Sequence, residues 1–203
     1  MRKMMYHIVA KILYFIIKLF RLLEVRGKEN IPKNKNYVVT CSHRGWVDVI
    51  MLAMSLYPTQ VHYMAKKELF NSRLIGTFLK YLNAFPVNRQ NPGPSTLKIP
   101  MKLLKENKIV GIFPSGTRTN EEVPLKRGAV TIAIKANVPI LPASYHGPTN
   151  LKEILIGKKA TVILGEPLYF DKQKEEMDKD ELLSYSLKLL ENKMKNLEKT
   201  FIK

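Results

Sequence analysis

The sequence predicts an α/β fold, with a largely parallel sheet that has helices on both faces. Short β-like runs alternate with helical stretches of about ten residues or more, which is typical of parallel sheets with helical connections. Residues 109–113 form an apolar run, as expected of a strand buried on both faces. With 203 residues, of which 45% are hydrophobic, the chain suits one domain with a sizeable core.

The predicted elements follow one another without an internal repeat or an interdomain linker. Strands are predicted by apolar, β-branched runs, and helices by apolar residues that recur every three or four positions. The last helix shows this spacing over residues 180–201, and the Pro-rich residues 91–94 are predicted to form a loop. In chain order we expect strands at 37–41, 61–65, 84–87, 109–113, 140–145 and 161–164, and helices at 47–56, 68–82, 97–106, 128–136 and 180–201.

The N-terminal segment is strongly apolar over residues 4–23, but Lys11 and Lys18 leave only six uncharged residues between them. A spanning helix needs about 20 mostly apolar residues. At roughly 100° per residue the basic side chains occupy one narrow arc of about 80°. We therefore predict an amphipathic helical segment at a membrane interface over residues 1–27, followed by an α/β domain over residues 28–203. Two alternatives remain open, namely a helix docked on its own domain and a span with snorkelling lysines.

The formal net charge of +17 implies an anionic partner, such as nucleic acid, an anionic membrane surface, a phosphorylated small molecule or an acidic protein. Residues 171–203 carry eight acidic and eight basic side chains, so the whole surplus lies in residues 1–170. A solvated, lysine-rich surface is the simpler explanation for part of it. The single cysteine, Cys41, excludes an internal disulfide and a cysteine-based metal cluster, and it is expected to be a buried strand residue. No convincing secretory cleavage site follows the N-terminal apolar stretch, which favours a cytosolic setting.

Polar and basic residues follow the predicted strands at the points where they end. In parallel α/β sheets, ligands bind beyond the carboxyl ends of the strands. A histidine and several cations are therefore expected to share one rim of the sheet. These residues are Ser42, His43 and Arg44, then Lys66 and Lys67, then Asn88 and Arg89, then Ser115, Gly116, Thr117 and Arg118, and finally Ser144, Tyr145 and His146.

His43 and Asp48 are five residues apart, with Asp48 expected in the first turn of a helix. If the chain doubles back there, the carboxylate accepts a hydrogen bond from one ring nitrogen and leaves the other as a base that can deprotonate an alcohol. The alternative is a loop histidine with Asp48 acting only as a charge at a helix N-terminus. His146 is a reserve candidate for the base, whereas His62 is expected within a strand.

The cations Lys66, Arg89 and Arg118 suit a phosphate group, because guanidinium groups bind phosphate oxygens bidentately and lysine adds a point charge. Gly116 allows the backbone to approach a ligand closely, and Thr117 offers a hydroxyl donor. Taken singly, each cation is better explained as a solvated surface residue, and their arrival together at the strand ends is what favours a site.

Several ordered sequence blocks resemble the 1-acylglycerol-3-phosphate O-acyltransferase (lysophosphatidic acid acyltransferase) family, in the short form found in Gram-positive bacteria. Residues 42–48, Ser-His-Arg-Gly-Trp-Val-Asp, resemble the first motif of these glycerolipid acyltransferases. The third motif, usually Phe-Pro-Glu-Gly-Thr-Arg, is matched by Phe-Pro-Ser-Gly-Thr-Arg at residues 113–118. The likeness runs from about residue 28 to 167, and its other blocks are residues 65–70 with 85–89, 126–129, and 138–142.

The resemblance implies transfer of a fatty acyl chain from acyl carrier protein or coenzyme A to the sn-2 hydroxyl of lysophosphatidate, giving phosphatidate in phospholipid biosynthesis. It implies His43 as the base and Asp48 as its orienting partner. The acceptor phosphate would be held by Arg118 with Gly116, Arg89 and Lys66. No metal, cofactor or acyl-enzyme is implied, and the thioester donor is a co-substrate. Both donors are anionic, in keeping with the net charge.

The expected location is the cytoplasmic side of the cell membrane, with peripheral or monotopic attachment. Ser115 departs from the family pattern, which usually has Glu at that position. We expect this change to alter the polar contacts to the acceptor and not to abolish activity, because His43 and Arg118 are retained.

Three other functions remain open. The first is acyl transfer to a different lysophospholipid. The second is a serine hydrolase with Ser115 as nucleophile, which is disfavoured because Phe113 occupies the first glycine position of Gly-x-Ser-x-Gly. The third is a non-enzymatic basic binding module, but the sequence offers no nucleic-acid recognition motif.

Overall fold

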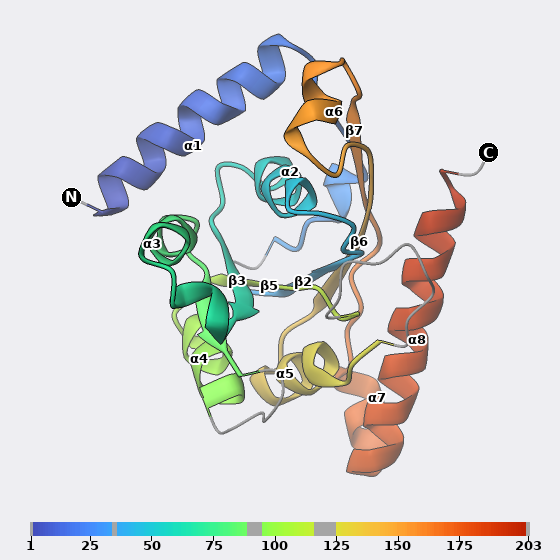
Figure 1. Ribbon diagram of the computed structural model, residues 1–203. Helices are drawn as coiled ribbons and strands as arrows, with labels where there is room; N and C mark the ends of the chain where they lie inside the picture. The colour runs from blue at the N-terminus through green and yellow to red at the C-terminus, as the bar shows by residue number, and fades with distance from the viewer. Residues whose placement is uncertain (1, 34–35, 89–94, 116–124, 202–203) are drawn as a thin grey trace.

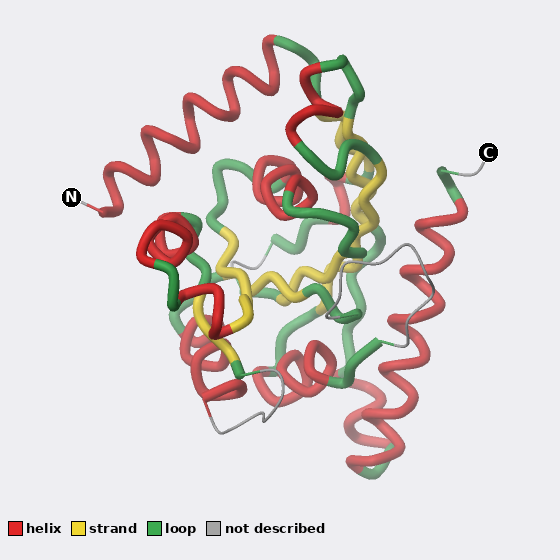
Figure 2. The backbone as a smooth tube through the Cα atoms, in the orientation of Figure 1, coloured by secondary structure: helices red, strands yellow, loops and turns green. Residues whose placement is uncertain are grey.

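The computed structural model describes residues 2–33, 36–88, 95–115 and 125–201. Within these residues, strands form one seven-stranded sheet in the order β1-β7-β6-β2-β5-β3-β4 (Figures 1 and 2). Neighbouring strands are parallel except β6 and β7, which are antiparallel. The strands are β1 (Leu23–Arg26), β2 (Val38–Cys41), β3 (Val61–Lys66), β4 (Phe85–Val87), β5 (Ile109–Ile112), β6 (Ile140–His146) and β7 (Ala160–Leu164).

Helices connect most of the strands and cover the sheet on both sides (Figure 1). The long C-terminal helix begins with a capping box, in which the Asp178 side chain accepts from the backbone of Glu181 and the Glu181 side chain accepts from the backbone of Asp178. The helices are α1 (Arg2–Leu19), α2 (Val47–Ser55), α3 (Arg73–Tyr81), α4 (Ser95–Lys105), α5 (Gly128–Ala136), α6 (Leu151–Leu155), α7 (Asp171–Glu176) and α8 (Lys179–Lys199), with short 3₁₀ turns η1 (Lys28–Asn30) and η2 (Lys67–Phe70).

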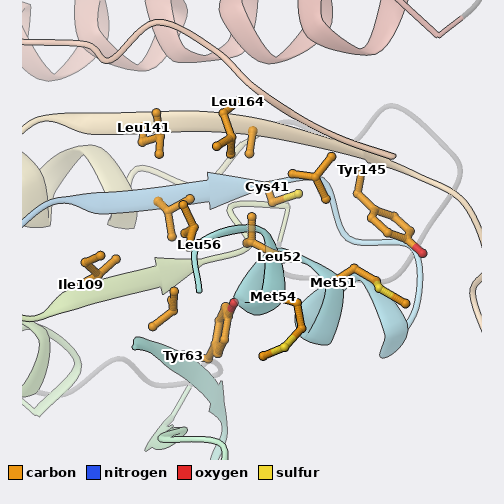
Figure 3. Close-up of a cluster of buried hydrophobic side chains, with 14 of the residues drawn as sticks. Cys41, Met51, Leu52, Met54, Leu56, Tyr63, Ile109, Leu141, Tyr145 and Leu164 are labelled. Atoms are coloured by element: carbon orange, nitrogen blue, oxygen red, sulfur yellow. The ribbon is translucent and has the colours of Figure 1, made fainter. Parts of the chain in front are cut away.

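Each face of the sheet has its own apolar core, because alternate residues of a strand point to opposite sides. On β2, Val39 and Cys41 pack with α2 and the inner side of α1, and we call this side the α2 face. Figure 3 shows this cluster, which joins Met51, Leu52 and Met54 of α2 to sheet residues that include Cys41, Tyr63 and Tyr145. Val38 points the other way, into a core formed with α4, α5 and α8, and we call that side the α8 face.

The predicted α/β class and the mostly parallel sheet are confirmed, and each predicted strand and helix is present with its ends shifted by at most a few residues. The stretch 68–82 is divided into η2 and α3, and the predicted loop at 91–94 lies outside the described residues. The short helices α6 and α7 are additional to the prediction.

The prediction of a helical segment through residue 27 was wrong at its C-terminal end. The helix α1 ends at Leu19, and Leu23–Arg26 forms the edge strand β1, which pairs in parallel with β7. Its side chains alternate, with Leu23 and Val25 half-buried and Glu24 and Arg26 exposed. This is the period of a strand, which the long apolar run before it obscured.

Helix α1 docks on the α2 face by one side only. Ala10 and Ile17 are buried there, and Leu13 and Tyr14 pack against the same core. Within the described residues no helix is long and apolar enough to cross a membrane. The rest of α1 is largely apolar as well, and its exposed large side chains are Ile8, Val9, Ile12, Phe15, Ile16 and Leu19, followed by Phe20.

Candidate active site

The side chains of His43 and Asp48 are in direct contact just beyond the carboxyl end of β2. His43 Nδ1 lies 3.1 Å from both Oδ1 and Oδ2 of Asp48. The Asp48 side chain is fully buried and that of His43 is 9% exposed. With Nδ1 directed at the carboxylate, Nε2 is the ring nitrogen that can exchange a proton with a ligand.

Backbone amides hold the Asp48 carboxylate in place. The N–H groups of Arg44 and Gly45 donate to Asp48 Oδ2, at 2.6 Å and 2.9 Å. Asp48 is also in the first turn of α2, where the helix dipole favours a negative charge. The chain therefore doubles back between His43 and α2, and the buried carboxylate has the hydrogen bonds that its burial requires.

The loop between β2 and α2 is packed tightly against the chain that follows β6. A Cβ added to Gly45 would lie 2.4 Å from the carbonyl oxygen of Thr149, so the backbones approach too closely for any side chain. The N–H of Tyr145 donates to Ser42 Oγ at 3.3 Å, and Tyr145 Oη donates to the carbonyl of Pro148 at 2.6 Å. These contacts fix the loop that carries His43.

Aromatic rings support His43 from the neighbouring strand. Phe113, directly after β5, lies with its ring centroid 4.4 Å from that of His43, and Tyr63 of β3 stacks near Phe113 at 6.0 Å. Gly111 makes room for this arrangement, because a Cβ there would lie 2.5 Å from the ring of Tyr63. A glycine in the middle of a strand is thus explained by the close approach of a ring.

Two cavities meet at the side of His43. The first, of about 300 Å³, is lined by His43, Lys66 and Phe113, together with the apolar residues Val49, Tyr63, Met64, Ala65, Leu69, Leu79, Leu82 and Ala84. The second, of about 190 Å³, extends from it between α1, α2 and α3, and the two share Val49, Tyr63 and Leu82. Its remaining lining is Val9, Ala10, Leu13, Ile50, Ala53, Met54, Phe78 and Tyr81.

The predicted site residues fall into two groups. His43, Asp48 and Lys66 are described; Lys66 ends β3, lines the His43 cavity and lies 3.9 Å from Glu68 across an exposed ion pair. Ser115 is half-buried two residues after Phe113. The other predicted binding residues, Arg89, Gly116, Thr117 and Arg118, lie outside the described residues.

The remaining histidines predicted from the sequence are elsewhere. His146 is exposed at the end of β6, where its ring stacks on Phe201 at 5.1 Å. His62 is within β3, and burial lowers its pKa, as does the nearby charge of Lys108. Among the described residues, no group of three His, Cys, Asp or Glu side chains is arranged as metal ligands.

Sequence reasoning missed the apolar components of the site. From the sequence, Phe113 is only the first residue of a motif, and Tyr63 is only a residue of a predicted strand. The cavity lining comes from α1, α2, β3 and α3, which are distant in the sequence, so no local spacing indicates it. The signal that was present is the glycine at 111 within an otherwise apolar strand.

A buried base oriented by a carboxylate, beside an apolar cavity, is suited to deprotonating a hydroxyl on a lipid-like substrate. The comparison with protein families agrees with this chemistry. Residues 22–146 match the model of a family described as Acyltransferase. The chain belongs to the acyltransferase family.

Several of its relatives share one name. The chain is 50% identical to 1-acyl-sn-glycerol-3-phosphate acyltransferase of Bacillus subtilis over 199 residues, which are 95% of this chain and 100% of the relative. It is 37% identical to the enzyme of that name from Streptococcus pneumoniae, over 69% of this chain and 53% of the relative. The crystal structure of the 1-acyl-sn-glycerophosphate acyltransferase from Thermotoga maritima has the same fold, with a TM-score of 0.68 and 25% identity, covering 98% of this chain and 83% of that one.

Proposed function

We propose that this protein is a 1-acyl-sn-glycerol-3-phosphate O-acyltransferase, which transfers a fatty acyl chain from a thioester to the sn-2 hydroxyl of lysophosphatidate to give phosphatidate. The observation that carries the proposal is the contact of His43 with buried Asp48 at the wall of an apolar cavity. The relatives that share the whole length or most of the chain and bear this name support the same substrate.

In the proposed reaction His43 Nε2 takes the proton of the sn-2 hydroxyl as its oxygen attacks the thioester carbonyl carbon. The carbon–sulfur bond then breaks, and the departing thiolate receives the proton from His43. Asp48 stabilises the positive charge that the imidazole carries between these two proton transfers. The bond made is an ester and the bond broken is a thioester, so the reaction needs no redox partner.

The cavities favour an acyl chain as part of the substrate. Apart from His43 and Lys66 the first cavity is lined by apolar side chains, and the second continues the apolar lining beneath α1. Burying methylene groups there contributes about 0.8 kcal/mol for each CH₂. We assign the acyl chain nearest to the reacting carbonyl to this apolar space.

The acceptor phosphate is assigned to cations at the same rim of the sheet. Lys66 lines the His43 cavity, with its side chain 44% exposed, and can meet a phosphate that enters from solvent. Arg89 and Arg118, with Gly116 and Thr117, complete the proposed phosphate site from the sequence motifs. Ser115, in place of the usual Glu, is expected to contribute to acceptor choice.

Acyl carrier protein and coenzyme A thioesters are the two proposed donors. The apolar outer side of α1 carries exposed Lys11 and Lys18 along one edge, which suits attachment in the plane of an anionic membrane surface. We accordingly propose a membrane-associated enzyme without a nucleic-acid partner, and with no metal or cofactor in the reaction. The division into a membrane-interface segment and an α/β domain is part of this proposal.

An assay of the purified full chain tests the function. Each of two donors, acyl carrier protein and coenzyme A thioesters, is combined with lysophosphatidate and with neutral lysophospholipids, and products are identified by mass spectrometry. We expect phosphatidate only with lysophosphatidate, a kcat for His43→Ala lower by about 10³-fold or more, and near-normal kcat for His146→Ala. Turnover of His43→Ala at the wild-type rate would remove the mechanism.

Acylation of another lysophospholipid in that assay would establish the alternative acceptor. The hydrolase alternative needs Ser115 as nucleophile, so Ser115→Ala would abolish activity and a serine-reactive probe would label the protein. In the proposed transferase, Ser115→Ala retains transfer and changes the KM for the acceptor.

A further inference from the structure

Helix α3 displays large apolar side chains to solvent, and two of them, Leu74 and Ile75, line neither cavity. Leu74 is 85% exposed and Phe78 is 52% exposed, and Ile75 and Tyr81 beside them are exposed as well. The inner side of the helix is fixed at Gly76, where an added Cβ would lie 2.7 Å from the carbonyl oxygen of Phe70 in η2. Single exposed leucines are common, but contiguous large apolar residues on one helix side mark an interaction surface.

This surface is continuous with the exposed side of α1. The second cavity is lined by Val9 of α1 and by Phe78 and Tyr81 of α3, so the two helices border the same apolar space. Figure 1 shows α3 end-on beside the N-terminal half of α1. Leu69 of η2, which is also exposed, extends the apolar surface toward the His43 cavity.

The charged residues of the two helices are all basic, and the neighbouring Glu68 of η2 is paired with Lys66. In α3 the exposed Arg73 and Lys80 are seven residues apart and so lie on the same flank of the apolar side, and the helix contains no acidic residue. In α1, exposed Lys11 and Lys18 have the same relation to its apolar side. An apolar strip bordered by cations complements an anionic lipid surface, in which the apolar side chains enter the acyl boundary and the cations meet the headgroups.

A second copy of the chain is a poorer occupant for the same reason. Packing two such surfaces together would bring their basic flanks into proximity without acidic residues from either helix to offset the charge.

We propose that α3 is a second lipid-contacting element, which lies on the membrane surface together with α1 through Leu74, Ile75 and Phe78. This inference goes beyond the proposed function, which attaches the enzyme by α1 alone. With both helices on the lipid, the apolar cavity between them adjoins the bilayer, and an acyl chain reaches the His43 cavity along apolar contacts. The orientation of the active site on the membrane is then set by two elements rather than by one.

The test uses the full chain and vesicles of phosphatidylcholine with about one third phosphatidylglycerol. The variant Leu74→Glu/Ile75→Glu changes side chains that line neither cavity, and glutamate at the first turn of α3 is compatible with the helix. Tyr185→Glu is the control, because it puts a glutamate, with one of the two added charges, at an exposed aromatic residue of α8. We expect the vesicle partition coefficient of the double variant to fall at least about tenfold, and that of Tyr185→Glu to stay within about twofold.

Tryptophan fluorescence measures the contact between α3 and lipid directly. With Trp46, the single tryptophan, replaced in Trp46→Phe, the added change Leu74→Trp places one fluorophore on α3. On addition of vesicles we expect its emission to shift to shorter wavelength and to be quenched by brominated lipids. Unshifted, unquenched emission, or a double variant that floats like the wild type, would overturn the proposal.

Turnover of a short-chain lysophosphatidate below its micellar concentration separates this inference from the proposed function. The double variant should match the wild type there. If neither protein transfers an acyl group, the function fails while the flotation result still decides the role of α3. Self-association of the wild type without lipid, abolished in the double variant by sedimentation analysis, would assign the surface to a second copy instead.

Discussion

The helices on the α2 face of the sheet leave open apolar space, whereas the core of the α8 face is covered by the long helix α8 together with α4 and α5. Helix α8 has 21 residues and α2 has nine. Both cavities beside His43 lie on the α2 face. Among the described residues of α4 and α5 no large apolar side chain is exposed, and the exposed positions include Lys98, Lys102 and Lys135. We infer that the α8 face mainly stabilises the sheet; in the proposed function, the α2 face provides the chemistry and the surface for lipid.

The largest expected difference between the faces concerns two aspartates at helix N-termini. Asp48→Asn removes the charge that orients His43 and should lower kcat by about 10³-fold, because an amide cannot stabilise the imidazolium equally well. Asp178→Ala removes the cap of α8 and should lower the free energy of unfolding by about 1 kcal/mol with kcat unchanged. Steady-state kinetics and urea denaturation measure the two effects, and equal kcat values for both variants would contradict the division of roles.

Two glycines give the next comparison. Gly45→Ala must displace the loop from Thr149, and we expect kcat to fall at least about tenfold because His43 and Asp48 move apart. At Gly128, the first residue of α5, an added Cβ meets nothing within 4 Å, so Gly128→Ala should change the free energy of unfolding by less than about 1 kcal/mol and leave kcat intact. If Gly45→Ala has full activity, the close packing of this loop is not needed for the rate.

Vesicle partition compares the surfaces of the two faces. Phe15→Glu puts a charge on the outer side of α1 and should lower the partition coefficient by about tenfold. Lys102→Glu changes the charge on α4 and should lower the partition coefficient by less than about threefold, since that helix lies on the opposite face of the sheet from α1. Flotation at one ionic strength measures both variants. A larger effect from Lys102→Glu would place the membrane on the α8 face.

The smallest expected effect is at Cys41, beneath His43 in the core of the α2 face. The thiol is fully buried, and burial raises its pKa well above the ordinary value, with the charge of Asp48 adding to the effect. We expect negligible labelling by a thiol reagent at pH 8 in the folded protein and one equivalent after unfolding. Rapid labelling of the native protein would show that the cavities expose the core to solvent.

The regular elements of the fold were predictable because their apolar spacing is local. The strand at residues 109–112 is indicated by a continuous apolar run, and the helix at 128–136 by apolar residues that recur within a few turns. The edge strand β1 was missed because Leu23 and Val25 continue the apolar composition of α1, and only pairing with β7 makes them a strand. The antiparallel pairing of β7 with β6 likewise depends on a distant partner and not on its own sequence.

For the candidate site, the contact between His43 and Asp48 was predicted from five residues of separation and is present. The amide donors to Asp48 follow from the same turn. In contrast, the ring of Phe113 against His43 and the cavity under α1 require three-dimensional packing between β5, β3 and two helices. Spacing along the chain contains no information on these contacts.

The short connection between α1 and β1 would determine how the enzyme reaches its acceptor on a membrane. Only residues 20–22 connect the two elements, and they are hydrogen-bonded rather than free, with Phe20 N–H donating to Ile16 and Leu22 N–H to Ile17. A long flexible linker would allow the distance between His43 and the membrane plane to vary by tens of ångströms. A short, hydrogen-bonded join gives His43 a constant height above the plane of α1, so with α1 in the interface the enzyme scans lipid by lateral diffusion. The rate of acyl transfer would then depend on the mole fraction of acceptor in the bilayer, and not on the bulk concentration of lipid.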